Sequence, residues 1–150
     1  MPIATKSSKY DISKESSTAI IAKKISKTVK KGDVLFFHGE IGVGKTTFIR
    51  YLIHNLQKKN GLKLTEVPSP TFNLLNEYEV KELLIQHYDL FRLKNINETK
   101  NIGLLENRSE VLTLVEWPEK VKKKPKSRIE LIFEYKSKLD QRILKIHDFR

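Results

Sequence analysis

Hydrophobic residues recur along the chain with helical spacing in two segments. In each segment an apolar residue falls at every fourth position between polar ones, which gives a helix one apolar side. The first segment predicts a helix from an N-cap at Ser13 to about Lys31, and the second predicts a helix over residues 45–59. The repeating residues are Ile21, Ile25 and Val29 in the first segment, and Phe48, Leu52 and Leu56 in the second.

Strand patterns occupy most of the remaining chain. Two mostly apolar runs, Val34–His38 and Val111–Val115, predict strands that are buried on both faces. Alternating runs predict two hairpins, and a stiff turn at Pro68–Thr71 precedes the first of them. The hairpin strands are Phe72–Tyr78 with Leu83–Tyr88 and Ile129–Tyr135 with Arg142–His147, and a short helix is predicted at Asn97–Glu106. Helices flanking a mixed central sheet, with a C-terminal β-hairpin, predict an α/β fold.

The composition is that of an ordinary globular protein, with 39% hydrophobic and 31% charged residues. A chain of 150 residues is long enough for one domain with a buried core, and no linker or repeat divides it. We therefore expect a single domain over residues 1–150. The sequence has no cysteine, which excludes disulfides and thiolate zinc sites. It also has no apolar stretch long enough to span a bilayer, and we expect a cytoplasmic protein.

Charge is the one unusual feature of the composition. The formal net charge is +11, and six basic residues fall in the stretch Lys120–Arg128 without an acid among them. Such a run is either a solvated surface of a lysine-rich protein or a surface that binds a polyanion. The sequence leaves both interpretations open, and it places a candidate surface for tRNA or an acidic partner near this stretch.

The most informative motif follows the first predicted buried strand. Gly39, Gly44, Lys45 and Thr46 have the spacing of the phosphate-binding loop G-x-x-x-x-G-K-[ST], between a strand and a helix as that loop requires. Glycines allow backbone N–H groups to approach an anion, and the helix N-terminus adds partial positive charge. The lysine ammonium suits the β- and γ-phosphates, and the threonine hydroxyl suits Mg²⁺. The motif predicts a P-loop NTPase-like domain that binds a nucleotide with Mg²⁺.

A P-loop also needs a carboxylate on its metal side, at the end of a neighbouring buried strand. Asp89 and Glu116 each follow a predicted strand. Glu116 is favoured for the metal because its strand is the more apolar, with Asp89 as a second acid near the γ-phosphate. Spacing alone does not assign the two roles. Thr71 lies in the rigid turn, where nucleotide switches place a phosphate-sensing hydroxyl, although a hydroxyl that only stabilises its own turn fits as well.

Trp117 and the histidines have no clear functional pattern. For Trp117 the sequence favours a core or interface anchor over a platform that stacks on a base. The histidines lack metal-ligand spacing and are interpreted as ordinary strand and helix residues; they are His38, His54, His87 and His147.

The motifs taken together are more specific than the phosphate loop alone. In chain order they are GEIGVGKTTFIR, PSPTFNLLNEYE, HYDLFRL, NIG and LVEWPE. In this order and spacing, from about Ser13 to Glu119, the chain resembles the TsaE family, the bacterial P-loop ATPases of tRNA threonylcarbamoyladenosine biosynthesis. The final hairpin with Arg142 is compatible with the same family.

The resemblance implies binding and hydrolysis of ATP with Mg²⁺ in a supporting role. The pathway adds a threonylcarbamoyl group to the adenosine beside the anticodon, in tRNAs that read codons beginning with A. The family's ATPase docks on the transferase TsaD and its partner TsaB, and hydrolysis resets that complex for further turnovers. The resemblance therefore implies TsaD and TsaB as direct partners and tRNA as an indirect one.

The resemblance also implies a role for each matching position. The implied nucleotide-binding residues are Gly39, Gly42, Val43, Gly44, Lys45, Thr46 and Thr47 of the Walker loop, Glu15 and Thr18 near the base, Asp89 by the phosphates, and Arg142 from the last hairpin. The implied metal ligands are Thr46 and Glu116. The implied catalytic residues are Lys45, Glu116, Asp89 and Thr71.

Three classes of function compete on this sequence. The favoured class is a weak ATPase that partner subunits stimulate, in which the phosphates are positioned electrostatically. The alternative is a P-loop small-molecule kinase, which needs a lid with arginines over the acceptor, whereas the arginines of this chain are scattered. The third class is a nucleic-acid-binding module whose P-loop is incidental.

Overall fold

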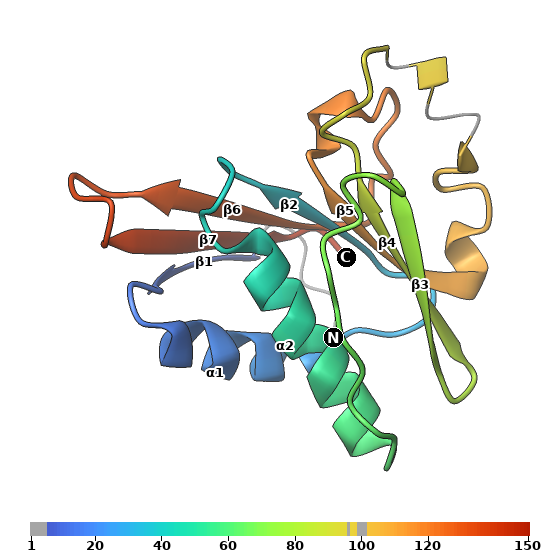
Figure 1. The fold of residues 1–150 in the computed structure, drawn as a ribbon, viewed down its shortest axis with the longest axis horizontal. Helices are drawn as coiled ribbons and strands as arrows, with labels where there is room; N and C mark the ends of the chain where they lie inside the picture. Colours follow the sequence, from blue (N-terminus) through green and yellow to red (C-terminus); the bar gives the residue numbers. More distant parts are fainter. Residues whose placement is uncertain (1–5, 96, 99–101) are drawn as a thin grey trace.

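The computed structural model describes residues 6–95, 97–98 and 102–150, and within them the chain forms one seven-stranded sheet with two α-helices (Figure 1). The strands are β1 (Lys6–Asp11), β2 (Val34–His38), β3 (Leu75–Val80), β4 (Leu83–Asp89), β5 (Val111–Glu116), β6 (Ile129–Tyr135) and β7 (Arg142–Asp148). The α-helices are α1 (Glu15–Ser26) and α2 (Lys45–Lys59), and short 3-10 helices, η2 (Arg108–Glu110) and η3 (Pro118–Lys120), flank β5.

The strand order across the sheet is β1-β7-β6-β2-β5-β4-β3. The central strands β6, β2, β5 and β4 run parallel, whereas β7 and β3 pair antiparallel with their neighbours. Parallel strands bring their carboxyl ends to one edge, and the register there pairs Glu116 with both Phe37 and Asp89. The loop after β2 therefore meets the ends of β4 and β5 at this edge, where open α/β sheets bind ligands.

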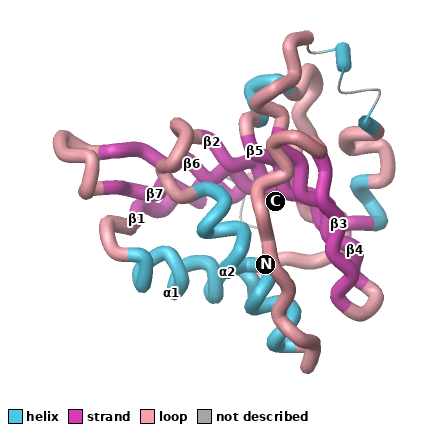
Figure 2. The backbone as a smooth tube through the Cα atoms, viewed as in Figure 1, coloured by secondary structure: helices cyan, strands magenta, loops and turns pink. Residues whose placement is uncertain are grey.

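Both α-helices lie on the same face of the sheet and pack against each other (Figures 1 and 2). The aromatic centre of this core is Phe37, Phe48 and Phe133, whose ring centroids lie 5.8 to 6.3 Å apart. Successive strand side chains point to opposite faces, so Phe36 lies on the other face, in a second apolar cluster with Val121 and other loop residues. Burial on both faces explains why β2 is a continuous apolar run.

The mixed sheet with its helices and its C-terminal hairpin confirms the predicted α/β fold class. Helix α2 has the predicted bounds, and β2, β4, β5, β6 and β7 match their predicted bounds within one residue. Across the ranges described above, no helix combines the length and apolarity needed to cross a membrane.

The start of the first helix differs from the prediction. Helix α1 begins after Lys14, which makes no side-chain capping bond, so the prediction of Ser13 as the N-cap is wrong. The Ser13 hydroxyl instead accepts a hydrogen bond of 3.1 Å from the backbone N–H of Arg142 in β7. The hydroxyl that the local pattern predicts as the helix cap is therefore bonded to a distant strand instead.

The end of the first helix also differs. Helix α1 ends at Ser26 rather than at about Lys31. The chain then turns, because the Lys30 N–H donates to the Asp33 carboxylate at 2.9 Å and the Gly32 N–H donates to the first residue of β5 at 2.9 Å. This turn directs the chain into β2, and the lysines before it lie outside the helix.

Strand β3 begins at Leu75, three residues later than predicted. Residues 71–74 form a turn in which the Leu74 backbone has a φ of +67° and its N–H donates to the Pro70 carbonyl at 2.6 Å. Phe72, which the alternation placed in the strand, is 82% exposed as a consequence.

No sequence pattern predicts β1, because its residues do not alternate between apolar and polar. This strand exists through its antiparallel pairing with β7 along its whole length. The helix predicted at Asn97–Glu106 falls partly outside the described residues, and the described residues 103–107 form turns.

Candidate nucleotide-binding site

A glycine-rich loop connects β2 to α2 at the carboxyl edge of the parallel strands. Gly39, Gly42 and Gly44 have φ values of +145°, +80° and +116°, which favour glycine. At Gly39 a Cβ would also lie 2.8 Å from the Phe133 carbonyl oxygen, so a larger residue would displace the backbone of β6. The loop ends at the N-terminus of α2, where the partial positive charge of the helix favours an anion.

This loop borders a cavity of about 410 Å³. Most of the nucleotide-binding, metal-binding and catalytic residues predicted from the sequence line it, namely Gly42, Gly44, Lys45, Thr46, Thr47, Thr71, Asp89, Glu116 and Arg142. The lining residues that the sequence did not assign are Ile41, Ser69, Phe91 and Trp117. The fold therefore brings five separate stretches of chain to one cavity: the glycine-rich loop with the start of α2, the rigid turn, the end of β4, the end of β5, and β7 with Arg142.

Glu116, the last residue of β5, faces the start of α2. The Thr46 hydroxyl lies 3.1 and 3.2 Å from the two carboxylate oxygens of Glu116. On its other side, the Glu116 Oε2 atom lies 2.7 Å from Nε2 of His87, a fully buried residue. Nε2 is the donor because a carboxylate only accepts, and among the described residues Nδ1 has no hydrogen-bond partner. Hydroxyl and carboxylate oxygens are the hard ligands that Mg²⁺ prefers, so Thr46 and Glu116 fit a Mg²⁺ site.

Asp89, the last residue of β4, belongs to a different cluster. Its Oδ2 atom accepts hydrogen bonds of 3.0 Å from the hydroxyls of Ser69 and Thr71, and its Oδ1 atom accepts one of 3.0 Å from the Phe91 N–H. These bonds attach the rigid turn to the end of β4. The geometry thus distinguishes the two carboxylates, since Asp89 holds the turn and not the hydroxyl of the phosphate loop.

Lys45 is buried at the first position of α2, with 4% of its surface exposed. Its ammonium donates to the Gly39 carbonyl and lies 3.7 Å from the centroid of the Trp117 ring, a cation–π contact. Burial lowers the pKa of this ammonium, and nearby carboxylates, Glu116 foremost, offset part of that effect. Trp117 has a φ of +60°, and its ring centroid lies 4.8 Å from that of Phe91. Its side chain both lines the cavity and packs against the second apolar cluster.

Arg142 extends from β7 toward the phosphate loop. Its Nη1 lies 3.5 Å from the Val43 carbonyl oxygen, and its guanidinium lies 5.5 Å from the centroid of the Tyr135 ring. The Nε atom is buried and has no hydrogen-bond partner among the described residues. A buried guanidinium N–H without an acceptor fits an anionic ligand in the cavity.

Glu15 and Thr18 are not brought to the cavity. Glu15 accepts a hydrogen bond of 2.6 Å from the Tyr51 hydroxyl, and Thr18 is buried in α1. Their contact with a base stays a prediction. Gly39 and Val43 do not line the cavity either: Val43 is buried, and Gly39 packs against the Phe133 backbone.

Sequence reasoning missed the roles of His87, Ser69 and Trp117. His87 lies two residues before Asp89 on one strand, so the period of two places both side chains on one face. Ser69 lies two residues before Thr71 in the same turn. These spacings are signals that the sequence contains, but they do not show that His87 would meet a carboxylate of the next strand.

The profile of one protein family, described as "Threonylcarbamoyl adenosine biosynthesis protein TsaE", matches residues 12–144. The chain belongs to the TsaE family. This finding confirms the family that the sequence motifs resemble.

Several TsaE proteins are similar to the chain, and each is named "tRNA threonylcarbamoyladenosine biosynthesis protein TsaE". The Rickettsia felis protein is 37% identical over 111 residues, which cover 74% of this chain and 63% of that protein. The Rickettsia bellii protein is 40% identical over 111 residues, 74% of each chain. The Bacillus subtilis protein is 34% identical over 118 residues, 77% of this chain and 70% of that one. The chain therefore spans less than two thirds of the Rickettsia felis relative.

A solved structure supports the same fold. The crystal structure of Bacillus subtilis YdiB superposes with a TM-score of 0.72 at 25% sequence identity. The superposition covers 99% of this chain and 89% of the YdiB chain.

Proposed function

We propose that the chain is a Mg²⁺-dependent subunit that binds and hydrolyses ATP in tRNA threonylcarbamoyladenosine biosynthesis. The modified base would be the adenosine beside the anticodon, in tRNAs that read codons beginning with A. The observation that carries this proposal is the convergence of Lys45 with the Thr46–Glu116 pair in the cavity beside the phosphate loop. The names of the TsaE relatives support the pathway. We propose a cytoplasmic location on the same grounds.

Thr46 and Glu116 would hold Mg²⁺ together with phosphate oxygens of the nucleotide. Bound there, the ion would neutralise charge on the β- and γ-phosphates. Within the described ranges, no three His, Cys, Asp or Glu side chains are grouped to hold a metal ion. A site with one protein carboxylate and one hydroxyl is the usual arrangement for Mg²⁺ that arrives with phosphates.

The remaining side chains would bind and orient the phosphates. The Lys45 ammonium, now bonded to the Gly39 carbonyl, would exchange that weak acceptor for a phosphate oxygen. Arg142 lines the cavity, and its Nε–H, which has no partner among the described residues, would donate to a phosphate oxygen. Asp89 accepts hydrogen bonds from the Ser69 and Thr71 hydroxyls and would thereby hold the rigid turn at the cavity, where Thr71 would sense the γ-phosphate.

The partners would be the transferase TsaD and its companion TsaB, with hydrolysis resetting their complex. Apolar residues near the cavity support a docking surface there: Ile41 is 68% exposed, Phe91 is 43% exposed, and Phe72 follows the rigid turn. Exposed apolar side chains gathered beside a site are typical of protein interfaces. A partner that covers the cavity would also exclude water from it.

The test compares ATP hydrolysis by the purified protein alone and with TsaD and TsaB. We expect weak turnover alone and faster turnover with the partners, and we expect Lys45→Ala to weaken ATP binding itself. Equal rates with and without the partners would contradict the regulatory role.

The same experiment tests the alternative, a P-loop small-molecule kinase. Among the described residues, Arg142 is the one arginine that lines the cavity, so no cationic lid covers an acceptor there. With γ-labelled ATP, hydrolysis releases the label as inorganic phosphate. Label found on a small-molecule acceptor would support the kinase instead.

A further inference from the structure

The chain between η3 and β6 forms a surface loop whose backbone is fixed at several points. Val121 and Pro125 are buried, although the residues between them are exposed. Arg128 Nη1 donates a hydrogen bond of 3.0 Å to the Pro125 carbonyl, and Lys120 Nζ donates to the Leu93 carbonyl at the start of the loop. Because of these anchors, the loop presents its side chains from a defined backbone, which lowers the entropy cost of binding.

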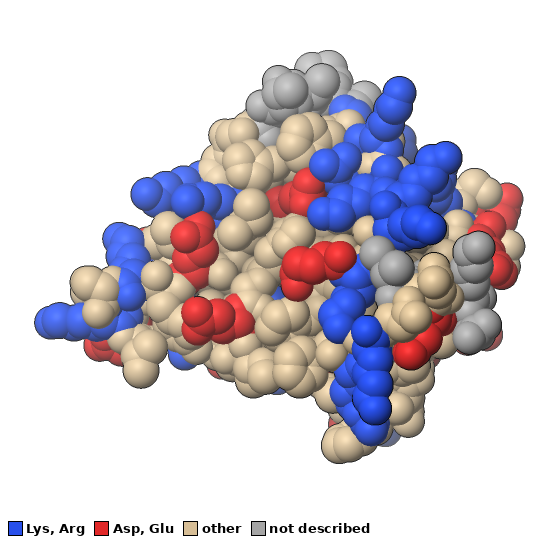
Figure 3. Space-filling view, turned by 90° about the horizontal axis from the view of Figure 1, so that it is seen from above, with Lys and Arg blue, Asp and Glu red and all other residues tan. Residues whose placement is uncertain are grey.

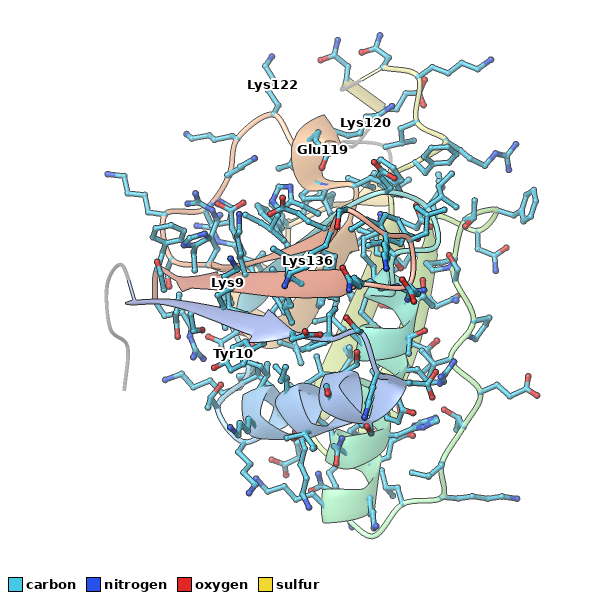
Figure 4. The ribbon with its side chains drawn as sticks, turned by 90° about the vertical axis from the view of Figure 1, so that its left-hand side faces the viewer. Lys9, Tyr10, Glu119, Lys120, Lys122 and Lys136 are labelled. Atoms are coloured by element: carbon cyan, nitrogen blue, oxygen red, sulfur yellow. The ribbon has the colours of Figure 1, made fainter. Side chains whose placement is uncertain are left out.

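Four lysines of this loop carry charge that the described residues leave unpaired. Arg128, by contrast, is neutralised by Glu130 at 2.7 Å. Lys and Arg side chains gather densely on this side of the molecule (Figure 3), and Lys122 projects away from the body (Figure 4). The exposed lysines without an ion pair in the described part of the chain are Lys122, Lys123, Lys124 and Lys126.

The lysines lie along a groove of about 650 Å³. Leu104, Leu105 and Arg108, from the segment that precedes β5, line the same groove. Cations from two separate segments of the chain therefore converge on one concave, partly apolar surface.

We propose that this surface, here named the lysine groove, binds the phosphodiester backbone of a folded RNA. Closely spaced cations bind a polyanion by releasing its condensed counterions, and this gain grows with the number of phosphates contacted. The groove holds four lysines and one arginine, enough for several phosphates of one backbone. The TsaE family acts in tRNA modification, so a folded RNA is the polyanion that this chain would meet.

The lysines of the groove suit a phosphodiester backbone. Each lysine is a compact point charge with three rotatable donors on a flexible stem, so its ammonium can bind phosphate oxygens without the fixed geometry of the arginine fork. The groove contains one arginine, and the remaining cations are lysines. Phosphate contacts of this kind fix position on a nucleic acid without reading its sequence.

The lysine groove is separate from the nucleotide cavity, because no residue lines both. The two are nevertheless close along the chain, since η3 connects Trp117 in the cavity to Lys122 in the groove. The inference therefore does not rest on ATP hydrolysis, and the two proposals fail separately.

The test measures binding of an unmodified tRNA transcript by fluorescence anisotropy over a series of KCl concentrations. The groove variant replaces all four lysines with glutamine: Lys122→Gln, Lys123→Gln, Lys124→Gln and Lys126→Gln. The matched control removes the same charge from exposed positions of α1 and α2: Lys23→Gln, Lys24→Gln, Lys58→Gln and Lys59→Gln. We expect the groove variant to bind tRNA roughly tenfold or more weakly and to lower the salt slope by about 3, whereas the control should change little.

The proposal is overturned if both variants lose affinity equally, because the effect is then one of net charge. It is also overturned if the groove variant keeps its tRNA affinity but loses binding to poly-L-glutamate, which would indicate an acidic protein partner. ATP binding of the groove variant should equal that of the wild type. A chain that binds tRNA through the groove but does not bind ATP would contradict only the proposed ATPase function.

Discussion

Glu116 and Asp89 occupy paired positions on adjacent parallel strands, yet each carboxylate is held by different groups. Glu116 contacts Thr46 and His87, and Asp89 contacts the hydroxyls of the rigid turn. At the scale of single residues, these different neighbours support the proposed metal role for Glu116 and the proposed role beside the γ-phosphate for Asp89. The division can be measured because both side chains have isosteric amides.

Glu116→Gln and Asp89→Asn each remove one negative charge without changing shape. We expect Glu116→Gln to lower Mg²⁺-dependent ATP hydrolysis by about a hundredfold or more and to raise the Mg²⁺ concentration at half-maximal rate, because a neutral amide is a poor Mg²⁺ ligand. Asp89→Asn should slow turnover without that shift in Mg²⁺ dependence. A Mg²⁺ titration of ATPase rate checks both, and a shift in Asp89→Asn alone would assign the metal to Asp89.

His87 gives a second prediction at this scale, because its Nε2–H donates a hydrogen bond to the Glu116 carboxylate and so fixes the orientation of that carboxylate. Removing the partner that orients a metal ligand typically costs ten- to a hundredfold in metal affinity. We expect His87→Leu to raise the Mg²⁺ requirement by about tenfold, and we expect His87→Gln, which keeps a donor, to recover most of it.

The control for His87 is Thr113→Val, which alters another fully buried polar side chain of the parallel strands. This variant should leave the Mg²⁺ titration unchanged. If His87→Leu behaves like Thr113→Val, the histidine has only a packing role.

At the scale of elements, the site depends on how closely the phosphate loop approaches β6. Gly39 has a φ of +145° and lies against the Phe133 backbone, whereas Gly61, after α2, has a φ of +70° and open space where a Cβ would lie. Both glycines have backbone conformations that favour glycine, but only the first also has a steric constraint. The pair therefore separates backbone strain from close packing of two elements.

We expect Gly61→Ala to lower the free energy of unfolding by about 1 kcal/mol, the cost of left-handed backbone for a residue with a Cβ. Gly39→Ala should cost about 3 kcal/mol or more, because the Cβ also overlaps the Phe133 carbonyl and the loop must move. Urea unfolding measures both. Equal losses would show that the approach of loop to strand adds nothing to the requirement for glycine.

At the scale of the whole molecule, carboxylates paired with arginines connect the C-terminal strands to the rest of the fold. Burial alone would raise the pKa of Glu130, but hydrogen bonds from Arg128 and His38 outweigh it and lower that pKa. Burial would likewise raise the pKa of Asp148, and hydrogen bonds from Arg150 lower it instead. The Arg150 guanidinium also bonds to Asp33, at 3.0 Å, before β2.

A lowered carboxyl pKa in the folded state means that the unfolded chain binds more protons in acid. The stability that these carboxylates contribute is therefore present above the ordinary pKa of Asp and Glu, and it is lost as the pH falls through the lowered values. We expect the urea midpoint to fall on acidification, and Arg150→Gln to be less stable at neutral pH with a shallower acid decline. Parallel pH profiles for wild type and Arg150→Gln would contradict this linkage.

The sequence by itself determined the elements whose signals are local. The apolar run of β2, the four-residue spacing of α2 and the glycines between them predict the phosphate loop, because backbone geometry and amphipathicity act over a few residues. The family motifs extend that prediction to a set of candidate side chains.

The tertiary structure decided what depends on contacts between distant segments. The register of β4 against β5 sets Asp89 beside Glu116 and brings His87 to the latter's carboxylate. Strand β1 forms by pairing with β7, and the Ser13 hydroxyl accepts a hydrogen bond from Arg142 of the same strand instead of capping α1. A local pattern fixes which face a side chain occupies, but its partner on that face depends on strand order and register, which only the packed sheet sets.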